Sequence, residues 1–154
     1  MIQCTFENGN QASLRHVTVA CLVIKNNKIL LAKRAKGLLE AGKWGPLGGF
    51  VERNETTTEA GIRETREESG WEITNLRLLR VNDNPAREER QNIDFIYIAD
   101  AVKEVGEPDS ESDELKWFAL DDLPARERIA FDHADNIDLY KKFLTSDLVL
   151  PVLG

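Results

Sequence analysis

Glutamates crowd into one short stretch of the sequence, directly after a pair of glycines. The stretch runs from Gly48 to Trp71 and has the sequence GGFVERNETTTEAGIRETREESGW. In a helix, Glu64, Glu67 and Glu68 fall three and four residues apart, so they share one face. Three carboxylates on one face form an all-oxygen set of the kind that Mg²⁺ or Mn²⁺ prefers. The spacing therefore predicts a divalent metal site.

The alternative is an acidic helix face in contact with solvent, because like charges four residues apart cost only about 0.2–0.5 kcal/mol per pair. Two features favour the metal site. Gly48 and Gly49 have no side chains, so the backbone there can approach a ligand closely. Two partly buried carboxylates about 6 Å apart would repel each other by roughly 3 kcal/mol. A partly buried cluster of three carboxylates therefore needs cations.

The acidic residues need a helix and a sheet to position them. Thr56 and Glu59 have the spacing of a capping box, and Gly70 is suited to end the helix. Within it, Ile62, Thr65 and Ser69 are predicted to face inward, and Gly61 indicates close packing against a neighbour. Apolar and β-branched runs predict strands at 16–24, 28–34, 72–81, 92–100 and 115–120. A second helix is predicted at 132–144. This order predicts an α/β protein with helices against a mixed sheet.

Length and charge narrow the class of protein. A chain of 154 residues favours one domain, taken as residues 1–154. The net charge of −7 argues against non-specific binding to nucleic acid or to anionic membranes. No apolar run is long enough for a transmembrane helix, the N-terminus lacks the features of a signal peptide, and Cys4 and Cys21 form no C-x-x-C pair. We expect a cytoplasmic protein.

The spacing of the fixed residues resembles a known motif. Gly49 is followed after five residues by Glu55, after seven more by Arg63-Glu64, and then by Glu67-Glu68 and Gly70. This resembles the Nudix box, G-x5-E-x7-R-E-U-x-E-E-x-G-U, where U is a bulky apolar residue. The resemblance extends from about Val17 to Leu144 and leaves 1–15 as an N-terminal extension of uncertain structure. It implies a Nudix-like α/β/α sandwich with a central mixed sheet.

The resemblance also implies roles for individual residues. Glu64, Glu67, Glu68 and the Gly48 carbonyl would bind Mg²⁺, with Mn²⁺ as the alternative, and Glu55 and Arg63 would form an orienting pair. Glu111 or Glu114 would supply a further carboxylate, as ligand or general base. A metal-activated water would then attack one phosphorus of a diphosphate. Thr65 and Trp71 depart from the motif at positions that serve packing. The glutamates and the arginine of the motif are all present.

Four residues are predicted to contact the substrate. Arg87 and Arg90 follow a Pro-x-Arg pattern similar to that of the ADP-ribose pyrophosphatase-like branch, and could bind a phosphate. Alternatively, they pair with neighbouring glutamates in a solvated loop. Trp44 could stack on a base or cover the end of the sheet. Arg34 completes this set.

Three functions follow from the resemblance. The leading hypothesis is a metal-dependent hydrolase of nucleoside diphosphate derivatives, with ADP-ribose or a dinucleotide as first guess. The second is a nucleoside triphosphate pyrophosphohydrolase of the kind that removes 8-oxo-dGTP. The third is a non-catalytic nucleotide-binding or regulatory module. The expected partners are a small-molecule nucleotide and a second copy in a homodimer, with no nucleic acid and no membrane.

Overall fold

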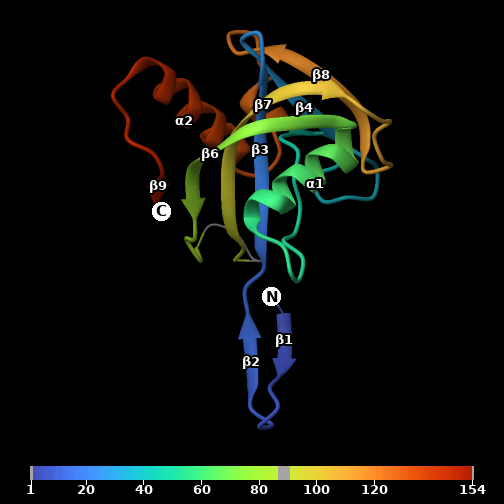
Figure 1. The fold of residues 1–154 in the computed structure, drawn as a ribbon, viewed down its shortest axis with the longest axis vertical. Coiled ribbons are helices and arrows are strands. Elements are labelled where there is room, and N and C mark those ends of the chain that lie inside the picture. The colour runs from blue at the N-terminus through green and yellow to red at the C-terminus, as the bar shows by residue number, and fades with distance from the viewer. Residues whose placement is uncertain (1, 87–90, 154) are drawn as a thin grey trace.

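The computed structural model describes residues 2–86 and 91–153 (Figure 1). Its two α-helices are α1, Thr57–Ser69, and α2, His133–Thr145. A 3-10 turn, η1, spans Arg126–Arg128. The strands are β1 (Ile2–Thr5), β2 (Gln11–Leu14), β3 (Val17–Lys25), β4 (Lys28–Arg34), β5 (Trp44–Gly45), β6 (Trp71–Asn82), β7 (Ile93–Glu104), β8 (Ser112–Ala119) and β9 (Val152–Leu153).

Seven strands form the central sheet, in the order β5-β4-β3-β7-β6-β9, with β8 also paired to β4. β3 runs parallel to β7, and β9 runs parallel to β6, whereas the other pairs are antiparallel. The β3–β4 hairpin turns at Asn26 and Asn27, whose φ angles of 49° and 59° are those that a tight hairpin requires. The predicted mixed sheet is confirmed.

Alternate residues of β3 face two separate cores. Ala20 and Leu22 belong to a cluster that includes Ile137 and Tyr140 of α2. Their neighbours Val19, Cys21 and Val23 belong to a second cluster that includes Ala60 of α1. Because successive side chains of a strand point to opposite faces, the two helices cover opposite faces of the sheet. This is the predicted α/β/α sandwich.

The helix α1 begins and ends as its sequence predicts. Thr56 and Glu59 form the capping box, and Gly70 ends the helix in the left-handed conformation. A Cβ atom on Gly61 would lie 2.9 Å from the Cys21 sulfur, so the close packing predicted there is confirmed.

The inward face of α1 differs from the prediction at one position. Thr65 and Ser69 are fully buried as expected, but Ile62 is 43% exposed. Gly61 and Glu68 occupy the rest of the inward face, which turns Ile62 away from the sheet. Trp71 begins β6 and packs edge-to-face on Trp117 at 5.4 Å. Both departures from the box motif are thus packed against neighbours.

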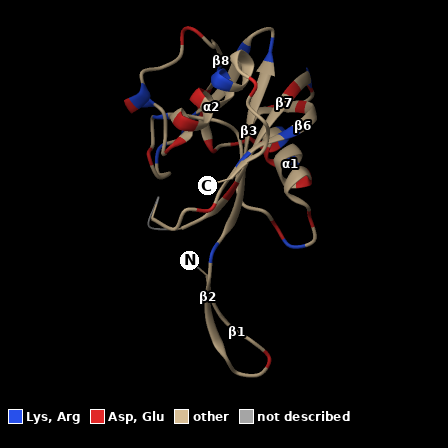
Figure 2. Ribbon diagram, turned by 90° about the vertical axis from the view of Figure 1, so that its left-hand side faces the viewer, with Lys and Arg blue, Asp and Glu red and all other residues tan. Residues whose placement is uncertain are grey.

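The N-terminal residues, left without a structural prediction, form a hairpin of β1 and β2. Ile2 lies opposite Leu14 and Thr5 lies opposite Gln11. The hairpin projects from the rest of the molecule and carries few charges (Figures 1 and 2). Within the described ranges, neither helix is long and apolar enough to cross a membrane.

Candidate functional site

A cavity of about 470 Å³ lies where α1 meets the start of β3. Its walls come from segments that are far apart in the sequence. They include residues of β3, the glycine segment, α1, the loop before β8 and the turn before α2, among them Thr18, Gly48, Gly49, Phe50, Glu52, Glu64, Glu68, Asp94, Glu111 and Phe131. Residues of the predicted box and residues outside it therefore line the same cavity.

The glycine segment lies directly against β3. The Leu47 carbonyl accepts the Cys21 N–H at 2.7 Å, and the Gly49 carbonyl accepts the Val19 N–H at 2.9 Å. Gly48 has a φ of 152°, and a Cβ atom there would overlap the Val19 carbonyl. A Cβ atom on Gly49 would lie 2.6 Å from the Glu64 carboxylate. Glycine is therefore required at Gly48, where the backbone passes directly against β3, whereas a side chain at Gly49 would displace the Glu64 carboxylate.

Glu64 and Glu68 project from α1 into the cavity. Glu68 is 9% exposed and accepts the Gly48 N–H at 2.8 Å. Burial raises the pKa of Glu68 to about 8; the Gly48 hydrogen bond opposes this rise, whereas repulsion from Glu64, Asp109 and Glu111 adds to it. Burial also raises the pKa of Glu64. The buried Glu68 and the partly buried Glu64 thus both resist ionisation until a cation compensates their charge.

Arg63 organises the acidic residues through all five of its N–H groups. Two of them contact the Glu55 carboxylate, at 3.1 and 2.8 Å, which is the predicted ion pair. The other three reach Glu64 at 2.8 Å, Glu67 at 3.1 Å and the Phe50 carbonyl at 3.1 Å. An arginine has five donors in a fixed fork, so none is left unused. Arg63 therefore fixes the glycine loop and the helix relative to each other.

Glu67 lies apart from the other two box glutamates. Its side chain is 54% exposed, contacts Arg63 and does not line the cavity. Consistently, no three Asp, Glu, His or Cys side chains in residues 2–86 and 91–153 already surround one metal position. Glu67 thus lies at the surface, where its carboxylate is paired with Arg63, and its role as a metal ligand stays a prediction.

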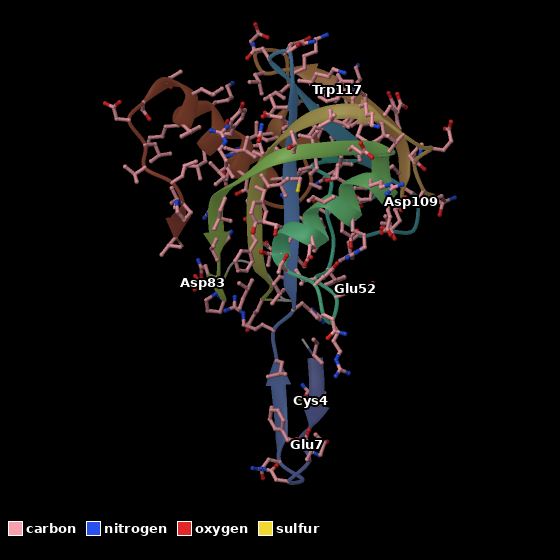
Figure 3. The ribbon with its side chains drawn as sticks, in the orientation of Figure 1. Cys4, Glu7, Glu52, Asp83, Asp109 and Trp117 are labelled. Carbon is pink, nitrogen blue, oxygen red and sulfur yellow. The ribbon has the colours of Figure 1, made fainter. Side chains whose placement is uncertain are left out.

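The loop before β8 adds acidic residues from outside the box. Glu111 lines the cavity, and its charge raises the pKa of both Glu64 and Glu68, after the larger effect of burial. Asp109, labelled in Figure 3, donates its backbone N–H to the Glu67 carbonyl near the end of α1. Glu114 instead lies opposite Lys33 at 3.8 Å and is half-exposed. Of the two predicted alternatives, the structure brings Glu111 to the cavity.

The residues predicted to contact the substrate lie in different parts of the structure. Arg34 lines the cavity. Trp44 is 5% exposed, packs edge-to-face on Phe118 at 4.9 Å and belongs to the core, which agrees with the alternative that it covers the sheet and not with base stacking. Arg87 and Arg90 lie outside the described residues. Phe131, for which the sequence pattern makes no prediction, lines the cavity just before α2.

Comparison with known proteins agrees with this geometry. A model of the NUDIX domain matches residues 14–140, which include the glycine segment, α1 and the loop that carries Glu111. The chain belongs to the Nudix family. It is a Nudix hydrolase by descent, and the helix α1 carries its Nudix box.

Two curated relatives illustrate the range of the family. The ADP-ribose pyrophosphatase of Methanocaldococcus jannaschii is 35% identical over 128 residues, covering 82% of this chain and 73% of the relative. The oxidized purine nucleoside triphosphate hydrolase of Danio rerio is 34% identical over 113 residues, covering 72% of this chain and 70% of the relative.

Two solved structures share the fold. A NUDIX hydrolase from Nitrosomonas europaea superposes with a TM-score of 0.79 at 24% identity, covering 99% of this chain and 92% of that one. A bifunctional NMN adenylyltransferase/ADP-ribose pyrophosphatase from Francisella tularensis, complexed with AMP and a manganese ion, has a TM-score of 0.65 at 26% identity. That match covers 84% of this chain and 42% of the other.

The donor atoms of this Nudix site suit a hard divalent cation. Glu68 is buried and Glu64 is partly buried, and Arg63, 2.8 Å from Glu64, compensates only part of their combined charge. Mg²⁺ is commonly held by one or two carboxylates together with waters and substrate phosphates. The residues present therefore fit a metal that is completed by its substrate.

Proposed function

We propose that this Nudix protein is a divalent-metal-dependent hydrolase that cleaves the diphosphate linkage of a nucleoside diphosphate derivative, with ADP-ribose as its first candidate substrate. The observation that carries this proposal is the buried carboxylate of Glu68 next to the partly buried carboxylate of Glu64, beside a glycine segment in a cavity of about 470 Å³. The name of the Methanocaldococcus jannaschii relative and the AMP and manganese of the Francisella tularensis complex support it.

In this proposal Glu64 and Glu68 hold Mg²⁺ or Mn²⁺, with the Gly48 carbonyl as a further ligand. The bound metal would neutralise diphosphate charge and lower the pKa of water. Arg63 keeps the Glu64 carboxylate oriented through its contact of 2.8 Å. Glu67 would serve as a third metal ligand only if its carboxylate left Arg63, with which it is paired at 3.1 Å.

Glu111 is our assignment for the general base. It lines the cavity from a loop, separate from the two carboxylates that would hold the metal. A carboxylate within hydrogen-bond reach of the attacking water can remove its proton. Attack on one phosphorus in line with the leaving oxygen would release a nucleoside monophosphate and a second phosphate-bearing fragment.

A nucleoside triphosphate pyrophosphohydrolase is the second candidate. It is favoured by the 34% identity to the oxidized purine nucleoside triphosphate hydrolase of Danio rerio. The same metal-binding carboxylates would serve this reaction, so the two candidates differ in the part of the substrate beyond the diphosphate.

A panel of substrates separates these functions. The purified protein is incubated with ADP-ribose, dinucleoside polyphosphates, nucleotide sugars, ordinary nucleoside triphosphates and 8-oxo-dGTP, each with Mg²⁺, Mn²⁺ or EDTA. We expect AMP and ribose 5-phosphate from ADP-ribose, only with metal. Preferential cleavage of 8-oxo-dGTP to its monophosphate would favour the second candidate. A compound that raises the melting temperature without being cleaved would identify a non-catalytic binding module.

We also propose that the β1–β2 hairpin contacts a second copy of the chain in a homodimer. Ile2 and Cys4 lie opposite Leu14 and Ala12, so one face of the hairpin is apolar. Ile2 and Leu14 are 43% and 42% exposed. A two-stranded hairpin is only marginally stable alone in water, and covering this face would stabilise it.

Light scattering tests this assembly. We expect the mass of a dimer for the full chain, and of a monomer for the double substitution Ile2→Ser and Leu14→Ser. Ser13→Thr, on the polar face, is the matched control and should remain dimeric. A full chain that is monomeric at every concentration would contradict the proposal.

A further inference from the structure

Phe131 is an exposed aromatic residue that the chemistry of the box does not use. It lies between η1 and α2, lines the cavity and is 42% exposed. Its φ of 51° places a bulky side chain in the left-handed region. Such a conformation is unusual for phenylalanine and persists only where the surroundings fix it.

Neighbouring groups hold Phe131 from several sides. Its backbone N–H donates to the Glu40 carboxylate at 2.6 Å, and Lys43 pairs with Glu40 at 3.0 Å. The Arg34 guanidinium lies 5.1 Å from the centre of its ring. His133 packs against the ring with an interplanar angle of 85°. The ring is thus fixed before any ligand arrives, so little conformational entropy is lost when a ligand binds.

The surroundings of Phe131 form an apolar part of the cavity wall. Leu38 and Leu39 line it with Phe131, and Leu39 is 51% exposed. Arg34 joins this wall to Leu39 by a hydrogen bond of 2.7 Å to the backbone carbonyl. Phe50 is the other exposed aromatic residue in the cavity wall. It belongs to the glycine segment, and its ring lies edge-on to His16 at 5.1 Å.

A nucleoside diphosphate derivative presents complementary parts. Its negatively charged diphosphate would face the metal held by the carboxylates. Its base is a planar ring with two apolar faces. Base stacking on a fixed aromatic side chain contributes substantially to nucleotide affinity. Arginine beside such a ring adds a planar cation that also favours stacking.

We propose that Phe131, together with Leu39 and Arg34, forms the subsite for the nucleobase of the substrate. This inference rests on the proposed function, because it assigns the base of the same substrate whose diphosphate meets Glu64 and Glu68. Phe131 then determines which part of a nucleotide derivative enters this end of the cavity.

Product binding tests the subsite without turnover. AMP and ribose 5-phosphate are titrated separately into the metal-loaded protein by calorimetry, for wild type, Phe131→Leu and Phe131→Tyr. We expect Phe131→Leu to raise the Kd for AMP roughly 5- to 150-fold, the range for loss of one stacked base. The Kd for ribose 5-phosphate should stay within about twofold, and Phe131→Tyr should retain AMP affinity because it keeps the ring.

Two results would overturn the assignment. The first is that AMP binds wild type and Phe131→Leu with the same Kd, or binds neither protein. The other is an equal loss for AMP and ribose 5-phosphate, which would indicate a general change in the cavity. Phe50→Leu is run alongside, and a larger AMP effect there than at Phe131 would also overturn it. Failure of ADP-ribose to be cleaved would refute the proposed function but leave the AMP titration decisive for the subsite.

Discussion

Replacing the Glu68 carboxyl by an amide should change how the stability of the metal-free protein depends on pH. Burial raises the pKa of Glu68 to about 8 from its ordinary value near 4.5. Between these values, the folded protein keeps a proton that the unfolded chain has released. The free energy of unfolding therefore falls as pH rises through this window, by up to about 1.4 kcal/mol per pH unit.

The magnitude follows from the same two pKa values. The stabilisation is fully present below about pH 4.5, and its loss is complete above about pH 8. Between pH 6 and pH 8, the wild-type protein should lose about 2 kcal/mol relative to a variant in which this group cannot ionise. Glu68→Gln is such a variant, and its amide oxygen can still accept the Gly48 N–H.

Urea unfolding in EDTA at pH 6, 7, 8 and 9 measures the difference. We expect the stability curve of wild type to fall more steeply than that of Glu68→Gln, and the two to run parallel again above about pH 8. Added Mg²⁺ should stabilise wild type more as pH rises, since metal binding must displace the proton. Parallel curves from pH 6 to pH 9 would refute the reasoning.

Three further substitutions test the geometry around the box. Arg63→Lys keeps the charge but loses the fork of five donors, so it should destabilise the protein by about 2 kcal/mol in urea unfolding; Arg66→Lys is the matched control and should have little effect. Gly49→Ala should weaken Mg²⁺ binding at least about tenfold in calorimetry, with stability changed by less than about 1 kcal/mol, because its Cβ would displace the Glu64 carboxylate. Gly61→Ala should cost about 1–2 kcal/mol through contact with Cys21, and Cys21→Ala in the same chain should recover most of the loss. The Arg63 contacts would be contradicted by wild-type stability in Arg63→Lys, and the contact at Glu64 by unchanged metal affinity in Gly49→Ala. Strictly additive effects of Gly61→Ala and Cys21→Ala would contradict the contact between these two positions.

Local signals were sufficient to predict most of the fold. The capping box and Gly70 fix the limits of α1, and paired asparagines fix the β3–β4 turn. The β1–β2 hairpin also had a local signal, since apolar and polar residues alternate on both sides of Asn8-Gly9.

The features that the sequence left open depend on contacts between distant segments. The orientation of Glu67 is set by Arg63, whose other donors reach the glycine loop. Trp44 is buried because its short strand pairs with β4 and its ring meets Phe118 from β8. Phe131 reaches the cavity because Glu40, 91 residues earlier, accepts its backbone N–H. The spacing of residues within one segment cannot predict contacts between segments that are distant in the sequence.

The central claim is that buried carboxylates of α1 support metal-dependent cleavage of a diphosphate. The most direct measurement compares kcat for ADP-ribose with saturating Mg²⁺ in wild type, Glu68→Gln and Glu72→Gln. Glu72 lies in β6, partly exposed and 3.6 Å from Lys103, so its substitution removes the same charge away from the cavity. We predict that Glu68→Gln lowers kcat by at least about 100-fold with the fold intact, while Glu72→Gln stays within about twofold of wild type. Equal turnover in Glu68→Gln and Glu72→Gln would contradict the account.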